Sequence, residues 1–233
     1  MKHSTSRIAA TVAAAIVLVL GTSYMTSLAQ SGFATGSLDL TASAHPTDVK
    51  PDVSESAFDV DSVWWRPLRA DTTAVTSAVC DGCTGASKTL QVIYGIHPFG
   101  TSVDNAAVAW SSCVDCGATA LSVQVVVLRG AREITANNRA LSTNAACAAC
   151  NTGALAYQLV VAGPDADRLS RTGLAELRAW VDEQARLLRA GAPAARLASA
   201  RTTAGSPITT LEQLVNKDLG TTTKSADVDL SRP

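Results

Sequence analysis

The strongest constraint on the fold is a C-x-x-C motif that occurs three times at nearly constant spacing. The motifs contain all six cysteines of the chain and begin 33 and then 34 residues apart. They are Cys80 and Cys83, Cys113 and Cys116, and Cys147 and Cys150. A glutamine follows each motif, eight residues after its second cysteine, and these glutamines are Gln91, Gln124 and Gln158. Three matches at one period indicate a supersecondary unit that is used three times.

Each repeated unit is predicted to be a β-hairpin with the C-x-x-C motif at its tip. The residues after each motif alternate, so that the glutamine points to one face and apolar side chains point to the other. The apolar positions are Leu90, Val92 and Tyr94, then Val123, Val125 and Val127, then Tyr157, Leu159 and Val161. Asp81-Gly82 in the first motif is a strong two-residue hairpin signal. An Ala-rich helix over 145–159 is the alternative for the third unit.

The cysteines are predicted to form structural disulfides. Residues i and i+3 of a β-turn lie within about 7 Å between their Cα atoms, and a disulfide needs about 4.4 to 6.8 Å. Each motif can therefore close across its own turn, although six cysteines allow many other pairings. A zinc or copper site is one alternative, because two motifs supply four thiolates. A thiol-redox centre is the other.

A C-terminal amphipathic helix is predicted over 172–190. Its apolar residues recur at helical spacing and are Leu174, Leu177, Val181 and Leu188. This stripe is expected to pack on the apolar face of the sheet. The repeat domain then spans 70–190, and 191–233 is predicted to be a flexible tail with a short helix over 209–219.

The N-terminal segment, residues 1–29, is predicted to be a signal peptide. Lys2 and Arg7 precede an apolar run over 8–21, and a small-x-small site ends at Ala29. We expect cleavage after Ala29, with an uncleaved signal anchor as the alternative. Export brings the cysteines into oxidising conditions, which favours disulfides.

Residues 30–69 are rich in Ser, Thr, Asp and Pro and are predicted to be a linker or a loosely docked arm. The apolar cluster around Trp64 and Trp65 is expected to pack onto the domain, with an exposed partner-binding patch as the alternative. His97, which precedes Pro98, is expected to be a turn or strand-end residue. The formal net charge of -1 gives no indication of nucleic acid or of an anionic membrane surface as a partner.

The order of Asn105–Ala109, Cys113–Cys116 and Gln124–Val127, with Arg171–Leu177 after the last unit, resembles an uncharacterised family of exported actinobacterial-type proteins. In that family the pattern N-x-A-x-A, C-x-x-C, Q-x-V is repeated, and the resemblance covers roughly residues 70 to 190. The first unit of the family often lacks cysteines, so the Cys80 motif is a departure.

Some relatives in that family carry the label of a peptide zinc metalloprotease. Such an enzyme needs H-E-x-x-H to bring two imidazoles and a base to one metal. After signal cleavage the histidines are His45 and His97, and neither lies in such a motif. The label is therefore not carried over.

Together these features predict an α+β domain. It consists of an antiparallel sheet of three β-hairpins with C-x-x-C tips, a C-terminal helix packed on the sheet, and disordered N- and C-terminal arms. We predict a secreted, non-enzymatic structural or interaction module with no catalytic residue and no cofactor, and with zinc or copper binding or thiol redox as the alternative. Its expected partner is an unknown envelope or extracellular protein, with no membrane span after signal cleavage. The glutamines Gln91, Gln124 and Gln158 are the candidate binding face.

Overall fold

The computed structural model describes residues 38–164, 167–192, 197, 205–220 and 223–233. The predicted signal peptide lies outside the described residues. The strands and helices of the described chain are β1 (Leu40–Ala44), β2 (Asp52–Trp64), β3 (Leu68–Ala78), β4 (Thr84–Ile96), β5 (Thr101–Ser111), β6 (Gly117–Arg129), β7 (Ile134–Asn144), β8 (Asn151–Ala162), α2 (Arg171–Arg189), α4 (Pro207–Leu219) and β9 (Thr223–Ser231).

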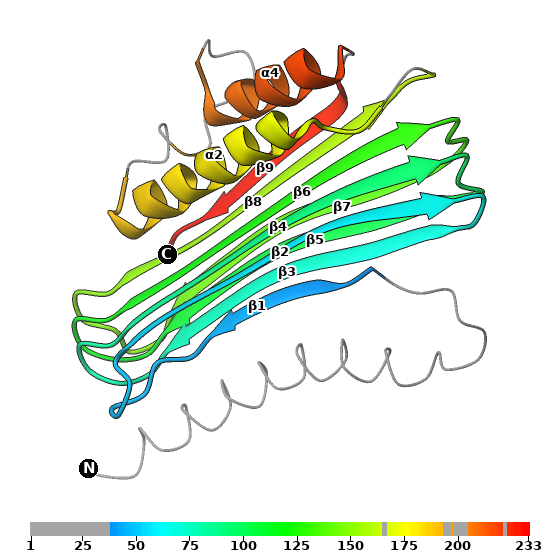
Figure 1. Ribbon diagram of the computed structural model, residues 1–233. Coiled ribbons are helices and arrows are strands. Elements are labelled where there is room, and N and C mark those ends of the chain that lie inside the picture. The colour runs from blue at the N-terminus through cyan, green and yellow to red at the C-terminus, as the bar shows by residue number, and fades with distance from the viewer. Residues whose placement is uncertain (1–37, 165–166, 193–196, 198–204, 221–222) are drawn as a thin grey trace, which may run out of the picture. The chain divides into compact units, whose positions relative to one another are not determined.

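The strands wind into a β-solenoid with two parallel sheets (Figure 1). One sheet has the order β1-β3-β5-β7, and the other has the order β2-β4-β6-β8-β9. Each coil of the chain contributes one strand to each sheet, so the described residues form four coils. All pairings are parallel except that between β8 and β9, which is antiparallel.

The sequence repeat sets the register of the strands, because residues one repeat apart are paired on neighbouring strands. Gln91 lies opposite Gln124, and Gln124 lies opposite Gln158, on neighbouring coils. Equivalent residues therefore lie beside each other on adjacent strands. The one extra residue of the last period is accommodated in the turn 145–150 before β8, where Ala146 has a φ of 52°.

The prediction of three antiparallel hairpins is wrong. The two strands that flank each C-x-x-C turn do not pair with each other. They belong to different sheets, and each pairs with the equivalent strand of the neighbouring coils. The physical reason is visible in β6, where every residue from Ala118 to Leu128 is buried. A strand buried on both faces is typical of a parallel sheet with both faces covered, whereas a two-layer hairpin sheet leaves one face polar.

The segment 30–69 is not a linker over its described part, because β1 and β2 form the first coil of the solenoid. β2 pairs with β4 along all 13 of its residues. It is an edge strand whose other side has no neighbouring strand in the described chain. Its polar composition, which resembles that of a linker, is explained by this exposed edge position.

The C-terminal tail is also more ordered than predicted. The predicted short helix is confirmed as α4, and the chain then returns as β9 along β8. β9 alternates polar and apolar residues, and its Ala226, Val228 and Leu230 pack against the helix-covered core. The tail therefore closes one end of the solenoid.

The predicted amphipathic helix is confirmed as α2, and its apolar stripe packs on the face of the sheet that was expected. Leu177 and Val181 join Val123, Val125 and Tyr157 in one buried cluster. Ser170 caps the helix, because its hydroxyl accepts a hydrogen bond of 2.9 Å from the backbone N–H of Gly173. The ring of Trp180 meets that of Tyr157 edge-on, with centroids 4.9 Å apart.

Candidate functional site

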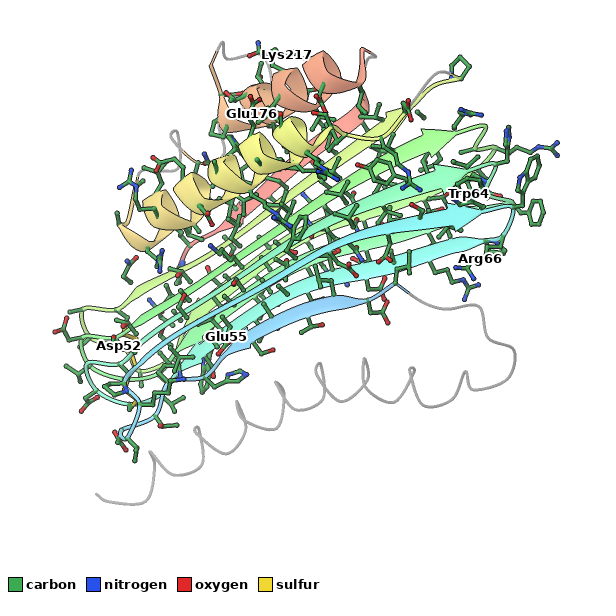
Figure 2. All side chains as sticks on the ribbon, viewed as in Figure 1. Asp52, Glu55, Trp64, Arg66, Glu176 and Lys217 are labelled. Carbon is green, nitrogen blue, oxygen red and sulfur yellow. A yellow bond between two sulfur atoms is a disulfide. The ribbon has the colours of Figure 1, made fainter. Side chains whose placement is uncertain are left out.

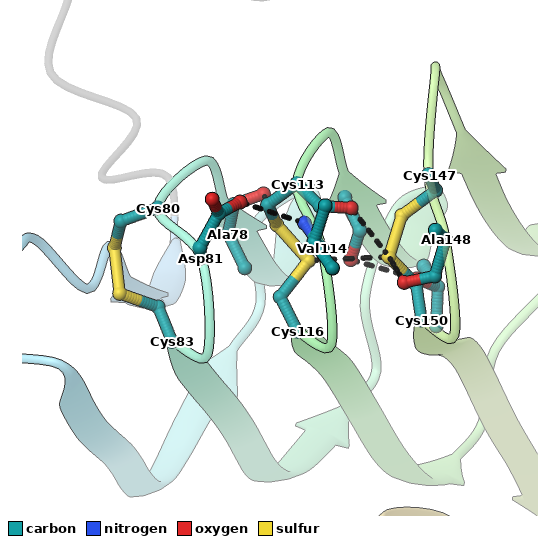
Figure 3. Close-up of a disulfide and its surroundings, with 12 residues drawn as sticks. Ala78, Cys80, Asp81, Cys83, Cys113, Val114, Cys116, Cys147, Ala148 and Cys150 are labelled. Carbon is teal, nitrogen blue, oxygen red and sulfur yellow. Dashed lines mark hydrogen bonds between the residues drawn. A yellow bond between two sulfur atoms is a disulfide. The ribbon is translucent and has the colours of Figure 1, made fainter.

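The C-x-x-C motifs form the turns that carry the chain from one sheet to the other. The structure pairs the cysteines within each motif, with Cα–Cα distances of 5.4, 6.0 and 5.9 Å along the chain (Figure 3). The third residue of each motif has a positive φ, 69° at Gly82, 54° at Asp115 and 55° at Ala149. The three turns therefore share one backbone conformation, although only the first has the glycine that favours it.

The three turns stack on one another through backbone hydrogen bonds. The N–H of Gly82 donates to the carbonyl of Val114 at 2.9 Å, and the N–H of Asp115 donates to that of Ala148 at 2.8 Å. In addition, the carboxylate of Asp81 accepts a hydrogen bond of 2.8 Å from the N–H of Val114. The disulfides thus form a ladder along one end of the solenoid.

Sulfur atoms of adjacent turns lie close together in this ladder. The Sγ atoms of Cys116 and Cys150 are 3.2 Å apart. The sulfurs of Cys113, Cys116 and Cys150 all lie within 4.8 Å of one another, as do the ligand atoms of Asp48, Cys80 and Cys83. A disulfide sulfur is not a thiolate, so these groups are potential ligands of a soft metal only after reduction.

A cavity of about 530 Å³ lies beside the disulfide turns, on the side of the sheet that α2 covers in part. Its polar lining residues include Asp52, Thr84, Asp115, Asn151 and Arg189, and the disulfide-bonded Cys116 also contributes to its wall. Hydroxyl, amide and carboxylate groups in this arrangement can hydrogen-bond a polar ligand.

The predicted binding face lies in the interior. Gln91, Gln124 and Gln158 are buried between the two sheets. The amide Nε2 of Gln124 donates to Oε1 of Gln91 at 3.1 Å, and Nε2 of Gln158 donates to Oε1 of Gln124 at 2.8 Å. A partner at the surface does not reach this ladder, because β4, β6 and β8 are buried on both faces where they carry the glutamines.

A second amide pair, formed by the buried Asn105 and the partly buried Asn138, was not predicted. Nδ2 of Asn105 donates to Oδ1 of Asn138 at 2.7 Å, and also to the backbone carbonyls of Ser122 and Tyr157 at 3.2 and 2.9 Å. The hydroxyl of Ser122 donates to Oδ1 of Asn105 at 2.6 Å. The sequence signal was present in the equal repeat position of the two asparagines, which in a solenoid places them side by side.

Burial raises the pKa of two tyrosines that contact the helical layer. Tyr157 donates its hydroxyl hydrogen bond to the carbonyl of Leu197, and burial raises its pKa far above the usual value. Burial also raises the pKa of Tyr94, whose hydroxyl accepts a hydrogen bond of 3.0 Å from the N–H of Leu169. Both phenols are therefore neutral, and their hydrogen bonds connect the sheet to the segment that follows β8.

His97 lies in a turn, as expected. It follows β4 with a φ of 50°, and its N–H donates to the carbonyl of Arg129 at 2.7 Å. Its ring stacks on that of Trp65. The two histidines of the described chain lie apart, because His45 bonds through Nδ1 to the hydroxyl of Ser77 at 2.8 Å beside the disulfide end.

The fold and its turns define the described chain as a parallel β-solenoid with a disulfide at each of three successive turns. Comparisons with protein-family models, with curated proteins and with solved structures found no match. The two described helices are too short or too polar to cross a membrane. The paired cysteines indicate an oxidising, extracytoplasmic location.

Proposed function

We propose that this protein is an exported, non-enzymatic interaction module whose solenoid is stabilised by its C-x-x-C disulfides. The observation that supports the proposal is the closure of three successive turns by three local disulfides. Such bonds form and persist in oxidising compartments. In the same proposal the segment 1–29 is a signal peptide that is removed after Ala29, and the partner is a component of the cell envelope or its surroundings.

The buried polar groups support a structural role for the interior. The glutamine and asparagine ladders consist of uncharged amides that bond to one another and to backbone carbonyls. Paired amides of this kind hold sheets in register, and they supply neither a nucleophile nor a proton donor near neutral pH. Interaction with a partner must then occur through the outer surface of the solenoid. The family resemblance does not indicate which part of that surface binds.

The test is an intact mass measurement of the exported protein after alkylation without reduction. We expect that no cysteine is alkylated and that the chain begins at Gln30. Alkylation of several cysteines without prior reduction would contradict the proposal, because it would show free thiols in the exported form.

Metal handling is a second candidate, and the closeness of Cys113, Cys116 and Cys150 favours it. A trigonal set of thiolates suits a soft ion such as Cu(I). This candidate predicts that the same cysteines become alkylated only after a chelator is added, and that a metal leaves with the chelator. Complete resistance to alkylation with and without the chelator would exclude it.

A further inference from the structure

The most exposed aromatic side chains of the described chain gather at one end of the solenoid. Trp64, Trp65 and Phe99 have 57%, 61% and 66% of their surface exposed. They lie at the turns that lead from β2 to β3 and from β4 to β5, at the opposite end of the strands from the disulfides. Figure 2 shows Trp64 and Arg66 at one end of the strands and Asp52 at the other. We call this the aromatic end.

The repeat holds these turns in a defined arrangement. Trp65, His97 and Gly130 occupy the same position in successive turns and have φ values of 54°, 50° and 69°. The rings of Trp65 and His97 stack with centroids 4.4 Å apart and planes inclined by 20°. Gly130 leaves room for this stack, because a Cβ atom at that position would overlap the imidazole of His97. The exposed rings therefore belong to an ordered surface.

The aromatic end also carries exposed positive charge. Arg66, Arg129 and Arg132 lie in or next to the same turns, with Glu133 beside them, and the oppositely charged Asp167 and Arg168 follow β8 at the same end. None of the three ion pairs found among the described residues involves these arginines. The disulfide end, in contrast, exposes four carboxylates, those of Asp48, Asp52, Asp81 and Asp115, beside the two cations Lys50 and Arg189. The formal net charge of -1 does not reveal that positive charge predominates at one end of the strands and negative charge at the other.

The projecting rings of the aromatic end suit a deformable surface, such as that of a membrane, better than a rigid small ligand. The rings project from the tips of turns, and they do not line the cavity beside the disulfide turns or the two smaller cavities next to α2. A small-molecule ligand is usually held in a cleft or cavity. Tryptophan side chains instead favour the interface between lipid headgroups and acyl chains, and arginines are attracted to anionic headgroups.

We propose that the aromatic end docks the solenoid onto a membrane surface that contains anionic phospholipid. Trp64, Trp65 and Phe99 enter the headgroup region, while Arg66 and Arg132 pair with phosphate groups. This inference rests on the proposed function and names its partner class. The solenoid would then stand on the membrane with its disulfide end directed away.

The test is flotation of the exported protein with vesicles of phosphatidylcholine alone and of phosphatidylcholine mixed with phosphatidylglycerol. We expect binding to the mixed vesicles that weakens with added salt, and weak binding to the neutral ones. Replacing both Arg66 and Arg132 by Gln should lower the affinity about fivefold for each arginine. Trp64→Ser combined with Phe99→Ser should lower it at least about tenfold.

Matched controls are available at the disulfide end. Val79 and Val114 are 54% and 52% exposed, and Arg189 is an exposed cation. Val79→Ser with Val114→Ser removes exposed apolar surface, and Arg189→Gln removes a cation, without changing the aromatic end. We expect them to bind as the unsubstituted protein does. The melting temperature of each variant is measured first, and we expect it to equal that of the unsubstituted protein because the substituted side chains are exposed.

The inference is overturned if the unsubstituted protein does not float with mixed vesicles, or if the control variants lose as much binding as the aromatic-end variants. Capture by an insoluble envelope polysaccharide, lost in the same variants while vesicles are ignored, would assign the aromatic end to a glycan instead. The alkylation result is measured on the same sample. A fully oxidised protein that ignores vesicles refutes the membrane inference alone, whereas free thiols refute the proposed function.

Discussion

The backbone N–H of Ala140 in β7 donates a hydrogen bond of 2.7 Å to a carboxylate oxygen of Asp229 in β9, across 89 residues of sequence. Two residues further along both strands, the N–H of Ser142 donates to the hydroxyl of Ser231 at 2.9 Å. β9 is hydrogen-bonded to β8 through its backbone and to the edge of β7 through its side chains. One strand thus covers the last strand of both sheets at this end of the solenoid, where β7 and β8 would otherwise present free edges for pairing with another chain.

Removal of the Asp229 carboxylate should weaken this cap. In Asp229→Ala the N–H of Ala140 loses its partner, so the free energy of unfolding should fall by about 1 to 3 kcal/mol. Asp229→Asn keeps an acceptor oxygen and should lose less. Urea unfolding measures both differences. Equal stability of the alanine variant and the unsubstituted protein would show that β9 does not cap β7.

Loss of the central amide of the glutamine ladder should destabilise the fold. Gln124→Leu leaves the amide N–H of Gln158 and the oxygen of Gln91 without their partner between the sheets, which should cost about 1 to 3 kcal/mol. Thr143→Val, at an exposed position of β7, is the control and should change little. A fully stable Gln124→Leu protein would favour an accessible, functional glutamine face, contrary to its buried position.

Each disulfide should contribute a modest stabilisation. For a loop of four residues, loop-closure entropy gives about 2 kcal/mol. Replacing Cys113 and Cys116 together by Ser should therefore lower the unfolding free energy by about that amount in thermal or urea unfolding. Reducing agent should then act less on this variant than on the unsubstituted protein. A complete loss of folding would mean that the stacked turns depend on one another more strongly than this local entropy allows.

The pH dependence of stability should reflect a row of acids on the outer face of the first sheet. Partial burial raises the pKa of Asp71, and the carboxylates of Asp39 and Asp104 raise it further, against the opposite effect of Arg139. Because the folded state holds this proton more tightly than the unfolded state, the contribution of Asp71 to stability falls as the pH rises from the ordinary aspartate pKa through the raised one.

Asp71→Asn removes that effect. We expect the variant to be more stable than the unsubstituted protein near neutral pH, with a difference that shrinks as the pH is lowered below about 4. Asp104→Asn is the contrasting variant, because Asp104 accepts a hydrogen bond of 2.9 Å from Arg139 and loses an ion pair when neutralised. A stability gain of Asp71→Asn that is the same at every pH would contradict the assignment.

The sequence predicted the units of this protein better than their assembly. The strand after each motif, its apolar face, the turn position of the cysteines and the helix that packs on that face all follow from local pattern. The pairing of the strands does not. A C-x-x-C turn between two strands fits a hairpin and a solenoid equally well, and the choice depends on what lies on the second face of the strands.

Two features contained the missing information. The first is the continuous apolar run after the glutamine in β6 and in β8, Val125–Leu128 and Leu159–Ala162, which indicates a strand that is covered on both sides. The second is the recurrence of Gln124 and Asn105 at fixed repeat positions, which favours stacking of identical amides in register. The first coil was missed because β2 lies at the edge and keeps a polar composition. β9 was missed because its partner strand is recognised only in the folded chain.

The most direct test of the account is the distance between β5 and β7. Val108 and Leu141 are paired in register on these neighbouring parallel strands, so their Cα atoms should lie about 5 Å apart. Spin labels on Val108→Cys with Leu141→Cys should then show strong dipolar broadening relative to the sum of the two single-label spectra. Val75→Cys with Leu141→Cys, which spans one further strand, should show clearly weaker broadening. If the Val108 and Leu141 labels show no interaction, the strands are not stacked one period apart and the solenoid is refuted.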